Sequence, residues 1–444
     1  MRIQLSDHFT YRKLFRFTLP PVIMMIFTSI YGVVDGFFVS NFAGDVPFKA
    51  VNLIMPFLMI LATVGFMFGS GGTALVANIL GEGNKERANR LFSLFVLVTF
   101  LLGVLFAVLG FIFIRPIATL LGAKGEILDN CVLYGRIILC ALPFQVLQYL
   151  FQSFFVAAEK PRLGLFVIVA AGVANMVLDA LLVTILPKEY KLAGAAIATA
   201  ASLTVGGGAP LIYFFRKNSS ILRLKRPEFD GRAIFKACTN GSSEFMSNVS
   251  MSVVGMLYNH QLIRYAGEDG IAAYGVMMYV SMIFAAAFIG YSIGVAPVIS
   301  FHNGAKNYDE LKSLLKKSLR ILAVGGVLML GVSELLARPL AHIFVSYSPG
   351  LLEMTVHGFR IFSVAFFFMG FSIFGSGFFT ALNDGLTSAI ISFLRTLVFQ
   401  VGAVLLLPLL FELDGIWISV VAADAMAVVL CGVFLITKRK KYHY

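Results

Sequence analysis

Residues 91–114 read LFSLFVLVTFLLGVLFAVLGFIFI, a run of 24 residues without a charged side chain, and Arg90 and Arg115 stand at its two ends. A helix of this length is about 36 Å long, and the hydrocarbon core of a bilayer is about 30 Å thick. We therefore interpret this stretch as a helix that crosses a membrane.

The composition extends this interpretation to the whole chain. Of its 444 residues, 59% are apolar and 13% are charged, whereas a soluble domain has roughly 45–50% apolar and about 25% charged residues. Such a chain has too few polar side chains to cover a water-soluble surface. The sequence therefore predicts an all-α membrane protein that crosses the bilayer many times.

A 19-residue hydropathy window gives twelve candidate membrane spans. They cover roughly residues 14–40, 52–77, 91–114, 131–156, 162–186, 192–215, 235–260, 271–299, 318–343, 356–381, 386–410 and 415–437.

The basic residues of the connecting segments predict the orientation in the membrane. With a cytoplasmic N-terminus, the inner segments hold 25 of the 35 Lys and Arg and the outer segments hold nine, and Arg395 lies within a span. Cytoplasmic loops carry the excess of positive charge. We therefore expect a multi-pass protein of the cell (plasma) membrane with both termini in the cytoplasm. Because the net charge of +12 is spread over short loops, we expect no nucleic-acid partner.

The longest basic connection lies near the middle of the chain and suggests two halves. Shifting the sequence on itself by 223 residues gives nine identities in the 39 positions from Ala43 to Gly81. We expect two six-helix lobes related by a pseudo-two-fold axis along the membrane normal. The N-lobe would span residues 1–215, a cytoplasmic basic linker 216–236, and the C-lobe 237–444.

We single out four acidic residues that lie within the predicted spans, Asp35, Asp179, Glu244 and Asp424. An ionised Asp at the centre of a span costs about 2.5–3.5 kcal/mol on the insertion scale, and such residues usually mark the path of an ion or a substrate. The alternative is a structural acid with a polar partner.

Asp35 and Asp179 both fall in the outer half of the bilayer, at similar depth. Asn175 lies one helical turn before Asp179 on the same face. No basic residue lies in the middle of the first six spans. Two carboxylates without a counter-ion disfavour a state in which both are charged, which favours a site that binds H+ or Na+. We expect no other metal and no cofactor.

The fourth span carries Gln145, Gln148 and Gln152 along one helical stripe. We expect this stripe to face a watery substrate cavity, to which Tyr31 is also assigned. The alternative is hydrogen bonding between helices.

Pro20 and Pro21 lie fifteen and fourteen residues before Asp35. A proline inside a helix removes a hydrogen bond and permits a bend, so we interpret the pair as a hinge; a helix-start proline is the alternative.

Arg395 and Asp424 lie near mid-depth in two consecutive antiparallel spans. Arg395 could neutralise Asp424 or Glu244, but one cation cannot neutralise both. We expect Arg395 to pair with Asp424 as a structural unit and to leave Glu244 as a second ion-coupling site, at which Na+ is an alternative to H+.

The sequence offers no catalytic constellation. Gly290–Gly294 matches the G-x-S-x-G motif, but that motif requires a strand–turn–helix context, and here it lies in an apolar span. The four Cys show no C-x-x-C spacing and the chain has no P-loop, so we expect neither an enzyme nor an ATP-driven pump.

The order of these features resembles the multidrug and toxic-compound extrusion (MATE) family, most closely its bacterial MepA-like branch. The resemblance covers almost the whole chain. It is carried by Pro20, by VDGFFVS (34–40) in the first span, by GEGNK (81–85) with its counterpart NGAKN (303–307), and by Leu394–Arg395.

The resemblance implies a monomeric secondary antiporter that exports organic, often cationic, compounds in exchange for H+ or Na+. It implies that Asp35 is the coupling carboxylate, surrounded by Asn175, Asp179 and Thr199. The alternative on the same scaffold is a flippase for lipid-linked saccharides, which would need a cluster of basic residues within the membrane.

Overall fold

The computed structural model describes residues 3–346 and 348–444, and all the regular structure in them is helical. The helices are α1 (Tyr11–Phe38), η1 (Val39–Ala43), α2 (Asp45–Gly81), α3 (Lys85–Leu120), α4 (Gly125–Ala157), α5 (Pro161–Ile185), η2 (Lys188–Tyr190), α6 (Lys191–Phe215), α7 (Gly231–Gly304), α8 (Tyr308–Val345), α9 (Pro349–Ser363), α10 (Ala365–Ala381), α11 (Gly385–Phe393), η3 (Leu394–Phe399), α12 (Gln400–Leu406) and α13 (Pro408–Tyr442).

The described helices account for twelve crossings of a membrane. Ten helical stretches are long and apolar enough to span one, with α11, η3 and α12 together forming one of them, and α9 with α10 forms a further span that is bent by 43°. The 74-residue α7 contains two spans, because its backbone leaves the helical region at Gly267, with φ of 64°. Gly44, between α1 and α2, also has a positive φ. These two glycines correspond under the shift of 223 residues, so the halves turn at equivalent positions.

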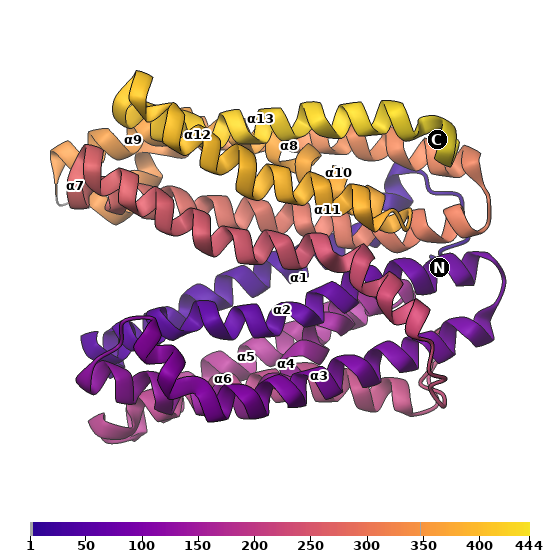
Figure 1. Cartoon of the computed structure of the whole chain (residues 1–444), viewed down its shortest axis with the longest axis horizontal. Helices are drawn as coiled ribbons and strands as arrows, with labels where there is room; N and C mark the ends of the chain where they lie inside the picture. Colours follow the sequence, from indigo (N-terminus) through magenta and orange to yellow (C-terminus); the bar gives the residue numbers. More distant parts are fainter. Residues whose placement is uncertain (1–2, 347) are drawn as a thin grey trace.

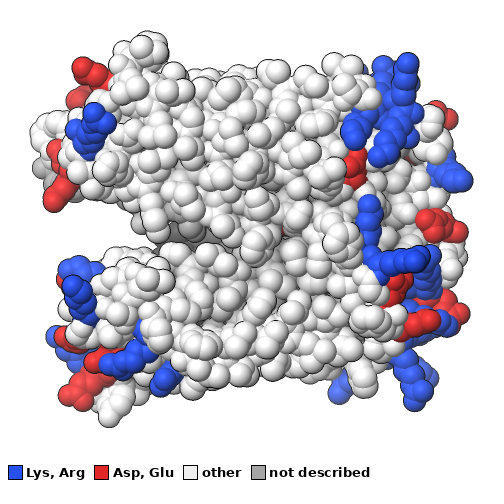
Figure 2. Space-filling model, in the orientation of Figure 1, with Lys and Arg blue, Asp and Glu red and all other residues white. Residues whose placement is uncertain are grey.

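The helices form two groups that lie side by side (Figure 1). We call α1–α6 the N-lobe and α7–α13 the C-lobe. Both chain termini and the connection between the lobes lie at one end of the molecule, the terminal end (Figure 1). At the opposite end a cleft separates the lobes, and we call this the open end (Figure 2). The predicted fold class, a bundle of two six-span lobes, is confirmed.

Glycines bring the two lobes into close contact near the terminal end. A Cβ added to Gly81 would lie 2.0 Å from the Phe301 carbonyl oxygen, and one added to Gly304 would lie 1.9 Å from that of Asn78. Gly81 and Gly304 are equivalent under the 223-residue shift, and so are Asn78 and Phe301. The two contacts therefore obey the internal two-fold symmetry, and any larger residue at either glycine would force the helices apart.

A short segment before α1 ties the lobes together at the same end. In this N-terminal clasp (residues 3–9), the Leu5 N–H donates to Glu159 Oε1 at the end of α4, at 2.9 Å. The Phe9 N–H donates to Glu310 Oε1 of α8 at 2.9 Å, and His8 Nδ1 lies 2.5 Å from Glu310 Oε2. Leu5 and Phe9 are fully buried. The clasp thus contacts both lobes.

Candidate functional site

A cluster of buried polar side chains lies inside the N-lobe, where α1, α5 and α6 meet. Thr199 of α6 donates from Oγ1 to Asp35 Oδ1 of α1 at 3.2 Å. The Asn175 amide of α5 lies 3.4 Å from Thr199 Oγ1. Asp179 lies one turn further along α5 and is fully buried, while Asp35 is 8% exposed. The structure therefore brings Asp35 together with the three residues that were predicted to surround it.

The Asp35 and Asp179 carboxyl groups are direct neighbours. Neither Asp179 oxygen accepts a hydrogen bond from an N–H or O–H donor in the described part of the chain. Two carboxylates have only acceptor atoms, so they can join in a hydrogen bond only when one of them carries a proton. A small cation between them would balance the pair equally well. The geometry therefore suits a site that takes up one positive charge.

Tyr134 of α4 belongs to this cluster and was not predicted. Its side chain is fully buried, and its hydroxyl lies near Asp35, Asp179 and Thr199. Tyr134 precedes Gln145 by eleven residues, or three helical turns, so it extends the glutamine stripe of α4 towards the acids. This spacing from Gln145 is the signal by which the sequence could have indicated Tyr134.

The glutamine stripe lies inside the N-lobe. Gln145, Gln148 and Gln152 are only 1–4% exposed, and Gln148 packs against Gly206 of α6. Tyr31 of α1 is half-buried, and its hydroxyl contacts Gln148. The stripe therefore does not line the open cleft in this conformation. Both polar atoms of the Gln152 amide nevertheless lack a hydrogen-bond partner among the described residues, as expected of groups that bind buried water.

Pro20 and Pro21 lie inside α1, nine and ten residues beyond its start at Tyr11, so the helix-start alternative is wrong. Both are buried. A Cβ added to Gly290 of α7 would lie 2.7 Å from the Pro21 carbonyl oxygen. The two prolines therefore sit where α1 contacts the C-lobe, and their role as a hinge stays a prediction.

The C-lobe contains the predicted ion pair. Arg395 Nε donates to Asp424 Oδ1 at 3.0 Å, and Ser372 Oγ lies 3.4 Å from the same oxygen. Arg395 lies in the π-helical turn η3, which interrupts the span between α11 and α12; such turns are common at functional positions. Glu244 of α7 lies close enough to Arg395 for their charges to attract each other. Arg395 therefore forms its ion pair with Asp424, as expected. Its charge also acts on Glu244, but without a direct ion pair between them among the described side chains.

Metal ligands do not gather elsewhere in the described ranges. Within residues 3–346 and 348–444, no three His, Cys, Asp or Glu side chains come together as a metal site. The Asp35–Asp179 pair offers two carboxylates and the Thr199 hydroxyl, a set that suits a proton or Na+.

Curated relatives of this chain are bacterial drug exporters. The Multidrug export protein MepA of Staphylococcus haemolyticus is 25% identical over 435 residues, which is 97% of this chain and 94% of that protein. The Multidrug export protein MepA of Staphylococcus aureus strain MRSA252 is 24% identical over 421 residues, or 94% of this chain and 91% of that protein.

Solved structures show the same fold. A MATE transporter of the MOP superfamily, described in an outward-facing conformation, superposes with a TM-score of 0.92 at 23% identity, over 98% of this chain and 97% of that one. A MATE crystal structure in a straight conformation gives a TM-score of 0.90 at 21% identity, over 98% and 97% of the two chains.

A family model matches both halves of the sequence. The MatE model matches residues 20–181 and again residues 245–406, which together make up most of the chain. The predicted resemblance to MepA-like proteins is thus confirmed, and the chain belongs to the MatE family of membrane transporters.

Proposed function

We propose that this protein is a secondary antiporter that exports organic, mainly cationic, compounds in exchange for H+ or Na+. The observation that carries the proposal is the contact between two buried carboxyl groups, Asp35 and Asp179, which is balanced only by an added positive charge. The names of its relatives support export of drugs as the class of transport. We infer no catalytic activity, since nothing in the family match points to an enzyme.

The arrangement supports alternating access. The lobes are apart at the open end and in contact at the terminal end (Figure 2). In the proposed cycle, a cation enters from the outside, binds at Asp35 and Asp179, and leaves to the cytoplasm when the terminal end opens. Substrate release and cation binding would compete at this site. We further propose that the protein acts as a monomer, in the plasma membrane, with both termini in the cytoplasm.

The energetics set a bound on the exchange. One proton that enters through 100 mV releases about 2.3 kcal/mol. At about 1.4 kcal/mol per tenfold ratio, this sustains roughly a 50-fold gradient of a neutral compound. Exchange of one proton for one monovalent cation moves no net charge, so in that case the pH gradient alone would drive export.

A flippase for lipid-linked saccharides is not favoured. Such a protein needs cations within the membrane to hold a diphosphate. Arg395 is the basic residue in mid-span, and it is already paired with Asp424.

The test is transport by the purified protein in liposomes. Accumulation of a fluorescent organic cation, ethidium, is followed while a pH gradient or a Na+ gradient is imposed separately. We expect one of the two gradients to drive transport, and an ionophore that collapses it to stop transport. If neither gradient drives the cation or a neutral dye, while the vesicles flip a lipid-linked saccharide, the antiporter proposal is wrong.

A further inference from the structure

A second concentration of polar groups lies away from the Asp35 cluster, at the terminal end of the N-lobe. A cavity of about 640 Å³ opens there between the start of α1, the turn from α4 to α5, and the end of α6. Its lining includes the side chains of Arg16, Lys160, Arg162, Phe166, Tyr213 and Ser219. A cavity of this volume accommodates a small molecule or a lipid headgroup.

The charge in this cavity is positive. Three cationic side chains, Arg16, Lys160 and Arg162, line it together with one acid, Glu159. Glu159 Oε1 is already occupied by the Leu5 N–H. The Lys160 ammonium donates to Ser219 Oγ at 2.9 Å, which holds the lysine at the wall. Arg16 and Arg162 are exposed.

The cavity lies at the boundary between the apolar and polar parts of the surface. Phe166 of α5 is 69% exposed and Phe215, the last residue of α6, is 79% exposed. Large aromatic side chains this exposed on a membrane protein face lipid, whereas Arg16 and Arg162 belong at the level of the headgroups. A molecule in the cavity would therefore meet cations at one end and an apolar wall at the other.

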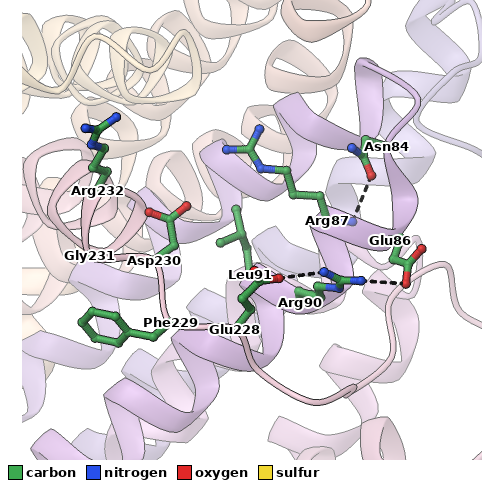
Figure 3. A pocket seen from close by; sticks show the side chains of 10 residues that line it. All are labelled: Asn84, Glu86, Arg87, Arg90, Leu91, Glu228, Phe229, Asp230, Gly231 and Arg232. Carbon is green, nitrogen blue, oxygen red and sulfur yellow. Dashed lines mark hydrogen bonds and ion pairs between the residues drawn. The ribbon is translucent and has the colours of Figure 1, made fainter.

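Another cavity at the same end shows what makes this one different. It has a volume of about 860 Å³ and also contains three arginines, Arg87, Arg90 and Arg232 (Figure 3). The lining also contains three acids, Glu86, Glu228 and Asp230, so its formal charges balance. Arg90 donates to Glu228 at 2.7 Å and to Glu86 at 3.1 Å (Figure 3), and Asp230 lies beside Arg232 in the chain. That cavity has no net positive charge to attract an anion.

We propose that the cavity between α1, α5 and α6 binds the phosphate of an anionic phospholipid of the surrounding leaflet. The Arg16 and Arg162 guanidinium groups would hold the phosphate oxygens, as basic pockets between membrane helices do. The acyl chains would lie along Phe166. Since Ile3 of the clasp also lines the cavity, the bound lipid would pack against the clasp where it meets the N-lobe.

The experiment measures lipid preference on the intact protein. The protein is equilibrated with mixed micelles of phosphatidylglycerol and phosphatidylethanolamine, and retained lipid is counted by native mass spectrometry. The test variant is Arg16→Gln with Arg162→Gln. The matched control is Arg87→Gln with Arg232→Gln, which removes the same charge from the self-neutralised cavity.

We expect the wild type and the control to retain phosphatidylglycerol in preference to phosphatidylethanolamine. Each cation near a membrane surface contributes a factor of roughly five, so the test variant should lose the preference by about 25-fold. Arg16→Lys with Arg162→Lys keeps the charge and should keep most of the preference for phosphatidylglycerol. If the glutamine variant folds poorly, a loss of this preference in the lysine variant would count against the proposal.

Three results would overturn the proposal. An equal loss in the control variant would mean that general surface charge holds the lipid. An unchanged preference in the test variant would place the lipid elsewhere. Displacement of the lipid by inorganic phosphate or glycerol 3-phosphate at equal concentration would mean that the cavity serves a soluble phosphate compound. None of these results depends on which ion drives transport.

Discussion

At the scale of single residues, the pair of Asp35 and Asp179 is the unusual feature of the N-lobe. Burial of both carboxyl groups beside each other is unfavourable while both are charged. Thr199 donates one hydrogen bond to Asp35, and no donor in the described chain reaches Asp179. This arrangement is the basis of the proposed cation site.

Replacing either acid should uncouple transport from the gradient. We expect Asp35→Asn and Asp179→Asn to fold and to reduce gradient-driven export to the background of empty liposomes, because an amide cannot exchange an ion. Substrate binding, measured by fluorescence, should survive and lose its dependence on pH or Na+. Asp45→Asn, at an acid that is 72% exposed in the same lobe, is the control and should transport normally. Wild-type transport by both test variants would show that the two acids are structural.

The Arg395–Asp424 pair should behave as a structural unit. Removing one partner of a buried ion pair costs about 3–5 kcal/mol, because the other charge is left alone. We expect Asp424→Asn to lower the yield of folded protein and its thermal midpoint, and Arg395→Gln in the same chain to restore much of both. A double variant no more stable than the worse single variant would exclude the pairing as the main role of Arg395. Glu244→Gln should instead keep the yield and change transport.

At the scale of elements, the N-terminal clasp is the segment most directly tied to the state of the lobes. Its backbone donates to Glu159 on the N-lobe and to Glu310 on the C-lobe. These two acids must separate if the terminal end opens. The clasp therefore stabilises the conformation in which that end is closed.

Weakening the clasp should shift the balance between the two conformations. Exposing a buried Phe costs about 1.5–3 kcal/mol, so Phe9→Ala should increase the fraction open at the terminal end by roughly tenfold or more. Spin labels at Arg87 of α3 and Lys316 of α8, read by pulsed EPR, should report a larger share of long distances. Phe15→Ala, at a side chain that is 58% exposed, is the matched control. An unchanged distance distribution for Phe9→Ala would mean that the glycine contacts alone hold the end closed.

The sequence predicted the features that the bilayer constrains, namely the membrane spans and the acids within them. It missed the features that depend on tertiary contacts. Acids within spans are costly, so Asp35 and Asp179 were conspicuous in the sequence. Tyr134 was not, because a tyrosine in an apolar span carries no such penalty. The clasp was missed because residues 3–9 form neither an apolar run nor a motif. The bend between α9 and α10 at Val364 has no proline or glycine to mark it.

At the scale of the whole molecule, the two ends differ in what they show to the solvent. The terminal end carries the chain termini, the clasp and the basic connection of residues 216–230 (Figure 1). That connection is fixed to α3, since the Arg223 N–H donates to Asn89 Oδ1 at 2.7 Å and the Lys225 N–H to Ser93 Oγ at 2.8 Å. The distribution of Lys and Arg predicts that this end faces the cytoplasm.

Labelling of single cysteines tests that orientation. In a variant without the four native cysteines, Lys188→Cys lies at the open end and Lys217→Cys in the connection at the terminal end. We expect a membrane-impermeant maleimide to modify Lys188→Cys in intact cells, and Lys217→Cys only after the membrane is permeabilised. The reverse pattern would invert the topology and, with it, the direction of the proposed exchange.

The reciprocal contacts of Gly81 with Phe301 and of Gly304 with Asn78 have a consequence for the origin of the chain. Because the two contacts are equivalent, an ancestral pair of identical six-span subunits would have made both of them, each glycine against the residue three positions before its own copy, as in an isologous dimer. Both contacts are present in this chain. The two buried acids are not repeated in the second half: the position equivalent to Asp35 is Tyr258, and that equivalent to Asp179 is Gly402. The two lobes thus share the glycine contacts but differ in their buried charged groups: the N-lobe contains a pair of carboxyl groups, and the C-lobe contains an ion pair.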